Sequence, residues 1–127
     1  MKTLCVMDSI SRANGGIFEA ERKLQQSLAA QPGFAVQVVG LRDAYTASDR
    51  GDWAPLTPMA CEVRGPQAFG YAPGLTDVLL KTEADLAYCV GLWKYPSVAA
   101  LSWARQTGKP MIVSPHGMLD PWALHNS

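Results

Sequence analysis

The stretch "TLCVMDSISRANGGIFEAERKLQQSLAA" (residues 3–30) decides the fold. It opens with "TLCVM" (3–7), an apolar run without polar alternation, which is typical of a strand. "SRANGG" (11–16) predicts a glycine-bearing loop after that strand. From residue 17 to 30, apolar residues recur at helical spacing among charged and amide side chains, which predicts a helix with one buried stripe. The stripe consists of Ile17, Ala20, Leu24 and Leu28.

The order of an apolar run followed by a helical pattern is repeated along the chain. Four further apolar runs follow, and helical patterns separate most of them. The predicted strands are 34–41, 59–65, 84–90 and 110–114, the predicted helices are 75–83 and 96–107 with a stop at Gly108, and 45–58 is predicted to be a loop. Strands alternating with helices indicate βαβ units. We therefore expect an α/β fold, a Rossmann-like doubly wound parallel sheet with helices on both faces, as a single domain over residues 1–127.

Composition narrows the class of protein. Eleven basic and eleven acidic residues cancel, which removes the basic footprint of a nucleic-acid binder. The chain contains three cysteines and no C-x-x-C pair, so free thiols in a reducing cytosol are expected. No run is long enough for a signal peptide core or a membrane span. These features predict a cytoplasmic protein and leave peripheral contact with the inner face of a membrane open.

The last residues resemble the start of another element. Asp120 and Pro121 form a good N-cap and first-turn pair for a helix. Only six residues follow Pro121, too few to propagate an isolated helix. We therefore expect the chain to be cut just inside a new helix, although a frayed tail remains the alternative.

Three loops leave the edge of the sheet where ligands bind in this class of fold. Gly15 and Gly16 stand after the first strand and before the first helix, where free N–H groups suit a phosphate. Trp93 and Lys94 follow the fourth strand, and could hold a sugar or an anion or simply pack and be solvated.

His116 lies in "SPHGMLDP" after the fifth strand. Its imidazole could donate to a hydroxyl or phosphoryl oxygen or act as an acid or base, and a structural role in the turn is the alternative. The second histidine, His125, has no ligand cluster around it, so no metal site is expected. Ser114 lies close to His116 in sequence, but the G-x-S-x-G motif of many serine hydrolases is absent.

Together these loops carry a family resemblance. "GLWKYPSVAALSWARQTGKPMIVSPHGMLDPWAL" (91–124) resembles the N-terminal domain of family 4 glycosyltransferases, which have the two-domain GT-B fold. The glycine pair at 15–16 agrees in position, and the match is loose over 41–75. The resemblance implies retaining transfer of a sugar from a nucleotide-sugar donor to a carbohydrate or lipid-linked acceptor, often in cell-surface polysaccharide biosynthesis.

The resemblance also implies roles for single residues. Gly15 and Gly16 would approach the donor diphosphate through backbone N–H groups, and His116 would contact the donor sugar and the reacting centre. Trp93 and Lys94 would be on the acceptor side. No metal or other cofactor is implied, because the leaving diphosphate can be stabilised electrostatically.

This chain departs from the family pattern in one respect. The donor-binding domain and its E-x7-E motif are absent from the sequence, so we expect the 127 residues alone to be inactive. An exposed interdomain face would favour dimerisation of the fragment.

Three rival interpretations remain. A stand-alone binding module for a phosphorylated metabolite or sugar would share the sheet and the loops. A signalling receiver domain is disfavoured because Asp8 has no acidic neighbour at the end of the first strand and a histidine, not a lysine, follows the fifth. A nicotinamide-dependent oxidoreductase is disfavoured because G-x-G-x-x-G is absent.

Overall fold

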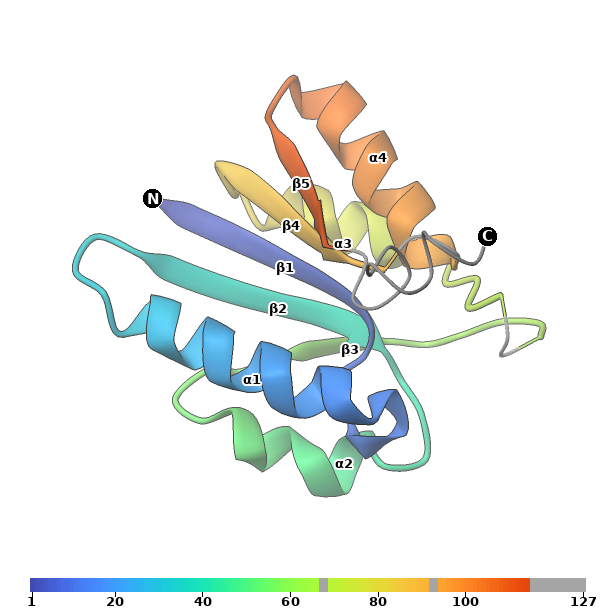
Figure 1. Ribbon diagram of the computed structural model, residues 1–127. Coiled ribbons are helices and arrows are strands. Elements are labelled where there is room, and N and C mark those ends of the chain that lie inside the picture. Colours follow the sequence, from blue (N-terminus) through green and yellow to red (C-terminus); the bar gives the residue numbers. More distant parts are fainter. Residues whose placement is uncertain (67–68, 92–93, 115–127) are drawn as a thin grey trace, which may run out of the picture.

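The protein is a three-layer α/β structure in which helices cover both faces of one parallel sheet (Figure 1). The computed structural model describes residues 1–66, 69–91 and 94–114. In chain order the elements are β1 (Lys2–Ser9), the 3-10 helix η1 (Arg12–Asn14), α1 (Gly16–Ala29), β2 (Ala35–Leu41), α2 (Thr46–Asp49), the 3-10 helix η2 (Arg50–Trp53), β3 (Met59–Cys61), α3 (Leu75–Lys81), β4 (Leu86–Val90), α4 (Tyr95–Thr107) and β5 (Met111–Ser114).

The sheet has the strand order β3-β2-β1-β4-β5, and every pair of neighbours is parallel. β1 lies at the centre, where Thr3 pairs with Val36 of β2 on one side and with Leu86 of β4 on the other. The chain builds outward from β1 to β3 and then returns to the other side of β1 for β4 and β5. The expected Rossmann-like, doubly wound parallel sheet is therefore confirmed.

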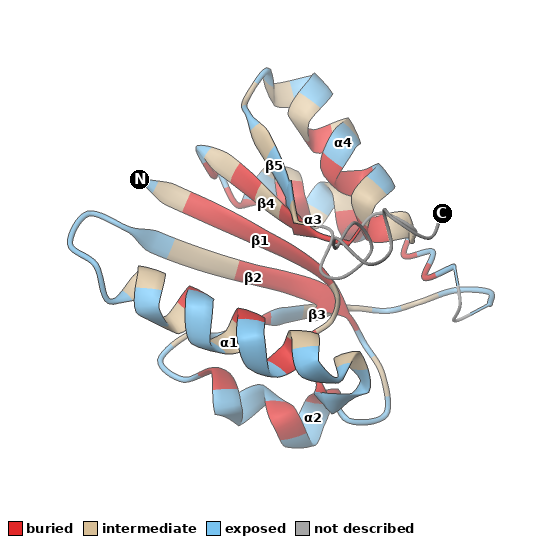
Figure 2. Ribbon diagram, viewed as in Figure 1, coloured by how far each residue is buried: buried red, intermediate tan, exposed pale blue. Residues whose placement is uncertain are grey.

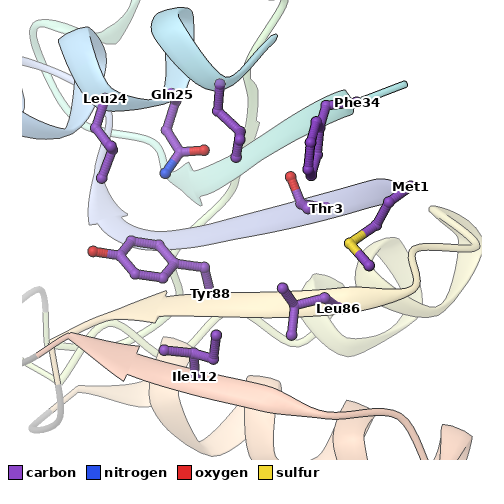
Figure 3. Close-up of a pocket in the computed structure, with 9 residues that line it drawn as sticks. Met1, Thr3, Leu24, Gln25, Phe34, Leu86, Tyr88 and Ile112 are labelled. Carbon is purple, nitrogen blue, oxygen red and sulfur yellow. The ribbon is translucent and has the colours of Figure 1, made fainter. Parts of the chain in front are cut away.

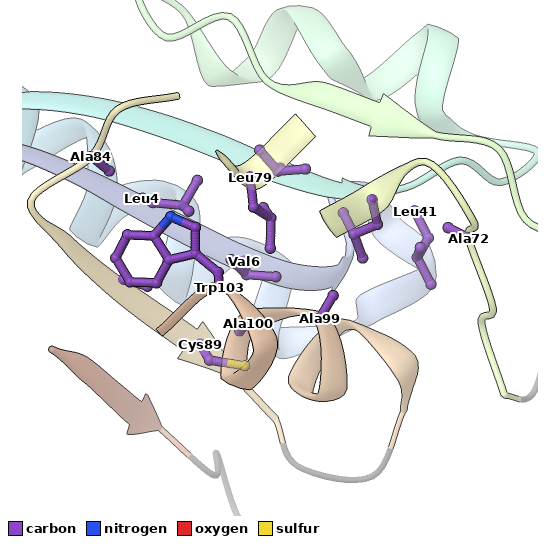
Figure 4. Packing of buried hydrophobic residues seen from close by; sticks show 13 residues of the cluster. Leu4, Val6, Leu41, Ala72, Leu79, Ala84, Cys89, Ala99, Ala100 and Trp103 are labelled. Carbon is purple, nitrogen blue, oxygen red and sulfur yellow. The ribbon is translucent and has the colours of Figure 1, made fainter. Parts of the chain in front are cut away.

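The central position of β1 explains its unbroken apolar sequence. Five consecutive residues, 3–7, are buried, because helices cover the strand from both sides (Figure 2). On one face α3 and α4 pack against the sheet, with Trp103 of α4 and Leu79 of α3 in a cluster around Leu4 and Val6 (Figure 4). A second cluster, on the opposite face, includes Cys5, Met7, Ile10, Phe18 and Trp53.

The cysteines behave as expected from their apolar neighbours. All three thiols are free, with Cys5 and Cys89 buried in β1 and β4. Burial raises the pKa of Cys5, and it raises the pKa of Cys89 to about 12. Neutral thiols of this kind pack as small apolar groups.

Two local predictions are wrong. Residues 45–58 are not simply a loop, because they contain α2 and η2. These short turns form because Asp49 and Trp53 are pulled into tertiary contacts, which no local periodicity reveals.

The predicted buried stripe of the first helix is also wrong. Ala20 and Leu24 are exposed, and α1 instead turns Phe18, Glu21 and Gln25 toward the sheet. Glu21 can be buried there because Tyr88 of β4 and Gln25 hydrogen bond to its carboxylate, at 3.3 and 3.5 Å. Polar partners thus override the apolar pattern on this helix.

Candidate functional site

The candidate site lies at the carboxyl edge of the sheet, where the winding direction reverses between β1 and β4. In open α/β sheets the loops that leave adjacent strands at such a point diverge to opposite faces, which leaves a crevice for ligands. Here α1, which follows β1, covers one face of the sheet, and α4, which follows β4, covers the other (Figure 1). The starts of α1 and α4 therefore lie at the same edge of the sheet.

Gly15 and Gly16 occupy the start of α1 as predicted. Gly15 has φ 59° and ψ −133°, a conformation that only glycine adopts without strain. Gly16 is the first residue of α1 and has an ordinary backbone conformation. A Cβ atom added at either position would meet no other described atom within 4 Å. The start of a 14-residue helix thus borders open space, an arrangement that suits an anion. The Gly15 amide itself donates to the Arg12 carbonyl oxygen at 3.0 Å, so it does not face an anion, contrary to the prediction from the sequence.

The β1–α1 loop is held by a carboxylate from the end of β2. Asp43 accepts hydrogen bonds from the Ser9 hydroxyl at 2.5 Å and from the Ser11 hydroxyl at 2.9 Å. Partial burial opposes ionisation of Asp43, but hydrogen bonds from Ser9, the Tyr45 amide and Ser11 lower its pKa below the ordinary value. The charged carboxylate therefore fixes both serines around the start of the loop.

A second carboxylate holds the middle of the same loop. The side chain of Asp49, only 5% exposed, accepts hydrogen bonds from the Arg12 amide at 2.8 Å and from Nη2 of Arg12 at 2.7 Å. These hydrogen bonds lower the pKa of Asp49 to about 2. The guanidinium also lies over the ring of Tyr45, 5.0 Å from its centroid.

The indole of Trp53 completes this support. Its Nε1–H donates to the carbonyl oxygen of Ile10 at 2.8 Å, inside the buried cluster. Since Asp43, Asp49 and Trp53 all belong to the segment after β2, that segment sets the geometry of the glycine loop.

Asp8 and Lys94 come from the ends of neighbouring strands and are near enough for their charges to interact. Asp8 is half-buried near the end of β1, and Lys94 is the half-buried residue immediately before α4. Burial raises the pKa of Asp8, and the positive charge of Lys94 acts in the opposite direction. No hydrogen bond to the Asp8 carboxylate is present within the described part of the chain. A carboxylate and an ammonium group therefore stand at the reversal point, where they can bind ligand hydroxyls or an anion.

The structure brings together only part of the predicted site. Gly15, Gly16 and Lys94 lie at the same edge of the sheet. Trp93 and His116 lie outside the described residues, and so does His125. Their roles stay predictions.

Sequence reasoning missed the residues that support the glycine loop. Asp43 is the second residue after β2, at the carboxyl edge, so the rule that ligand sites gather at strand ends could have drawn attention to it. Asp49 and Trp53 carried no such signal, because they lie in a segment read as a loop.

A separate cavity of about 260 Å³ lies on the face of the sheet that α1 covers (Figure 3). Its walls are almost wholly apolar and include Leu24 and Phe34. Thr3 and Leu86, which also line it, belong to the amino-terminal halves of their strands. The cavity is thus toward the opposite end of the sheet from the glycine loop and is not part of the candidate site.

Within residues 1–66, 69–91 and 94–114, no three His, Cys, Asp or Glu side chains gather in a way that could hold a metal ion. In the same ranges no helix is both long and apolar enough to cross a membrane.

The class defined by these observations is a Rossmann-like α/β domain with an open glycine turn at its carboxyl edge. No protein-family model matches the chain, and no curated protein matches it either. The function must therefore be argued from the geometry of the site and from the residues themselves.

Proposed function

We propose that this chain is the N-terminal, acceptor-side domain of a retaining glycosyltransferase. The enzyme would move a sugar from a nucleotide-sugar donor to a carbohydrate or lipid-linked acceptor in cell-surface polysaccharide biosynthesis. The observation that carries the proposal is the open backbone at Gly15 and Gly16, at the N-terminus of α1 and at the reversal point of the sheet. The resemblance of residues 91–124 adds the chemistry.

In this proposal different residues of the chain contact the donor diphosphate, the donor sugar and the acceptor. The amide group of Gly16 and the positive end of the α1 dipole stabilise the negative charge of the leaving diphosphate, and the open backbone at Gly15 lets the diphosphate approach closely. His116 contacts the donor sugar and the reacting centre, and Trp93 and Lys94 contribute to the acceptor side. The rest of the donor site belongs to a C-terminal domain that this sequence does not contain.

Three consequences follow for the whole protein. The 127-residue chain by itself is inactive. Detectable sugar transfer by the purified chain would contradict the proposal that the active site is shared with a C-terminal domain. The protein works in the cytoplasm or at the inner face of the membrane. Pairing of two copies through exposed apolar surface, tested by sedimentation, would be a property of the isolated domain.

The first test measures binding of a nucleoside diphosphate to the glycine turn. UDP, GDP and ADP are each titrated into the 127-residue chain and followed by ligand-detected NMR, which registers weak binding. In Gly16→Ala a methyl group enters the space left for the anion, and the helical conformation of residue 16 tolerates alanine. We expect this variant to weaken binding by about tenfold or more, equivalent to ~1.4 kcal/mol.

The matched control is Gly51→Ala. Gly51 is also surrounded by open space and has an ordinary φ, but it lies in η2 and not at the N-terminus of α1. Equal binding by wild type and Gly16→Ala would remove the glycine turn from the site. Binding of sugar phosphates in preference to all three nucleotides would favour the stand-alone binding module instead.

The second test concerns His116 in a protein that carries both domains. His116→Ala should abolish most of the transfer while leaving the fold intact, because the imidazole contacts the reacting centre. Wild-type turnover by this variant would exclude His116 from the site.

A further inference from the structure

Three aromatic rings gather beside the candidate site, at the start of α4. Tyr95 is the first residue of α4, and Phe69 and Tyr71 come from the connection between β3 and α3. The ring centroids of Tyr71 and Tyr95 are 4.9 Å apart in an edge-to-face arrangement, and those of Phe69 and Tyr95 are 6.0 Å apart. We call these three residues the aromatic platform.

The aromatic platform is fixed by packing against the core and against the end of β2. Tyr95 is half-buried and packs against the core cluster of α3 and α4, while its amide donates to the Phe69 carbonyl oxygen at 2.9 Å. Gly70, between the other two rings, has φ 71°, and an added Cβ would lie 2.5 Å from Cδ1 of Leu41. The backbone beneath the two outer rings is therefore packed tightly against the end of β2.

The two outer rings nevertheless remain exposed. Phe69 is 50% exposed and Tyr71 is 41% exposed. Removing aromatic surface from water is favourable, so two neighbouring exposed rings offer a surface suited to a ligand. The surface lies at the carboxyl edge, because the connection carrying both rings starts where β3 ends and reaches the start of α4 (Figure 1).

We propose that the aromatic platform binds a saccharide chain. The C–H faces of a hexose pack flat against aromatic rings, while its hydroxyl groups hydrogen bond with tyrosine hydroxyls and nearby charged groups. Lys94 is such a group, since its Cδ lies 3.9 Å from the Cβ position of Gly70. The inference rests on the proposed function only in assigning the bound saccharide to the acceptor.

The test is binding of neutral oligosaccharides without any nucleotide. Maltohexaose and cellohexaose are added to the 127-residue chain, and saturation transfer from protein to sugar protons is measured by NMR. We expect transfer to at least one hexasaccharide, a loss of about tenfold in affinity in Tyr71→Ala, and a clearly smaller loss in Tyr71→Phe, which keeps the ring and lacks only the hydroxyl group. Phe69→Ala should weaken binding in the same direction.

The matched control is Phe34→Ala. Phe34 is a phenylalanine of similar exposure, 39%, but it precedes β2 and lines the apolar cavity toward the other end of the sheet. Because Phe69, Tyr71 and Phe34 are all exposed, their variants should fold, and thermal unfolding checks this.

Three results would overturn the proposal. They are absence of transfer to both hexasaccharides, an equal loss of affinity in Phe34→Ala, and binding of anionic phospholipid vesicles, but not of sugars, that Tyr71→Ala abolishes. Saccharide binding by a chain that binds no nucleoside diphosphate would support the platform and count against the proposed transferase. Binding of a nucleoside diphosphate without binding of a saccharide would be consistent with the proposed transferase and would contradict the role of the aromatic platform.

Discussion

Replacing Trp53 with phenylalanine tests how the segment after β2 supports the glycine loop. The change removes one hydrogen-bond donor and keeps an aromatic ring against Phe18, whose centroid lies 6.2 Å from that of Trp53. The carbonyl oxygen of Ile10 then loses the donor that Nε1 supplies at 2.8 Å, in a residue with no exposed surface. Leaving a buried acceptor unpaired costs ~1–3 kcal/mol.

The smaller ring adds a packing loss. Trp53 has no exposed surface, so the space it vacates becomes a partial cavity that costs about 1–2 kcal/mol. The two effects together lower the free energy of unfolding by roughly 3 kcal/mol. For a domain of this size the midpoint of thermal unfolding then falls by about 10 °C.

The control is Trp103→Phe on the opposite face of the sheet. Trp103 is equally buried, in α4, but its indole nitrogen makes no hydrogen bond within the described part of the chain. Urea unfolding followed by circular dichroism gives the free energy of both variants. We expect Trp53→Phe to lose ~1–3 kcal/mol more than Trp103→Phe.

Hydrogen exchange provides a second readout. Amides between Ile10 and Gly15 should exchange faster in Trp53→Phe than in Trp103→Phe, because only the first variant frees the loop. Equal losses of stability and equal exchange in the two variants would refute the role assigned to this hydrogen bond.

Two further predictions concern the same loop. Gly15→Ala should destabilise the protein by about 1–3 kcal/mol, because alanine is strained at φ 59°, ψ −133°. Gly16→Ala should keep wild-type stability, and equal denaturation midpoints for the two variants would contradict the strain argument. The pKa of Asp49 is lowered to about 2, so the pair with Arg12 stabilises the fold fully above the ordinary carboxyl pKa of about 4 and is lost as pH falls through about 2. Asp49→Asn should remove this part of the acid dependence, measured by urea unfolding between pH 5 and pH 2, and an unchanged acid profile would show that the pair contributes nothing.

The local sequence was sufficient to predict those features that depend on burial or backbone conformation within a few residues. β1 is buried on both faces, so its apolar run identifies it regardless of what covers it. Gly108 ends α4 with φ 70°, as a glycine after a helical pattern predicts. Gly15 and Gly16 were assigned to the turn before α1 because glycine is required or tolerated there for reasons of the backbone itself.

The local sequence did not predict features that depend on a hydrogen bond to a residue far away in the chain. The buried face of α1 follows Glu21 and Gln25, because Tyr88 of β4 supplies a hydrogen bond that an isolated helix does not contain. The segment after β2 forms α2 and η2 because Asp49 and Trp53 reach back to the β1–α1 loop. These contacts join residues 37 and 43 positions apart in the chain, beyond the range of any helical or strand periodicity.

The sequence by itself therefore determined the α/β class, the alternation of strands and helices and the glycine turn, since each depends on burial or backbone conformation within a few residues. Only the tertiary structure decided the strand order, the carboxylates that fix the turn, and the aromatic platform formed by the β3–α3 connection and the start of α4. The physical reason is that hydrogen bonds and ring contacts between distant segments form only after the sheet has brought the strand ends together.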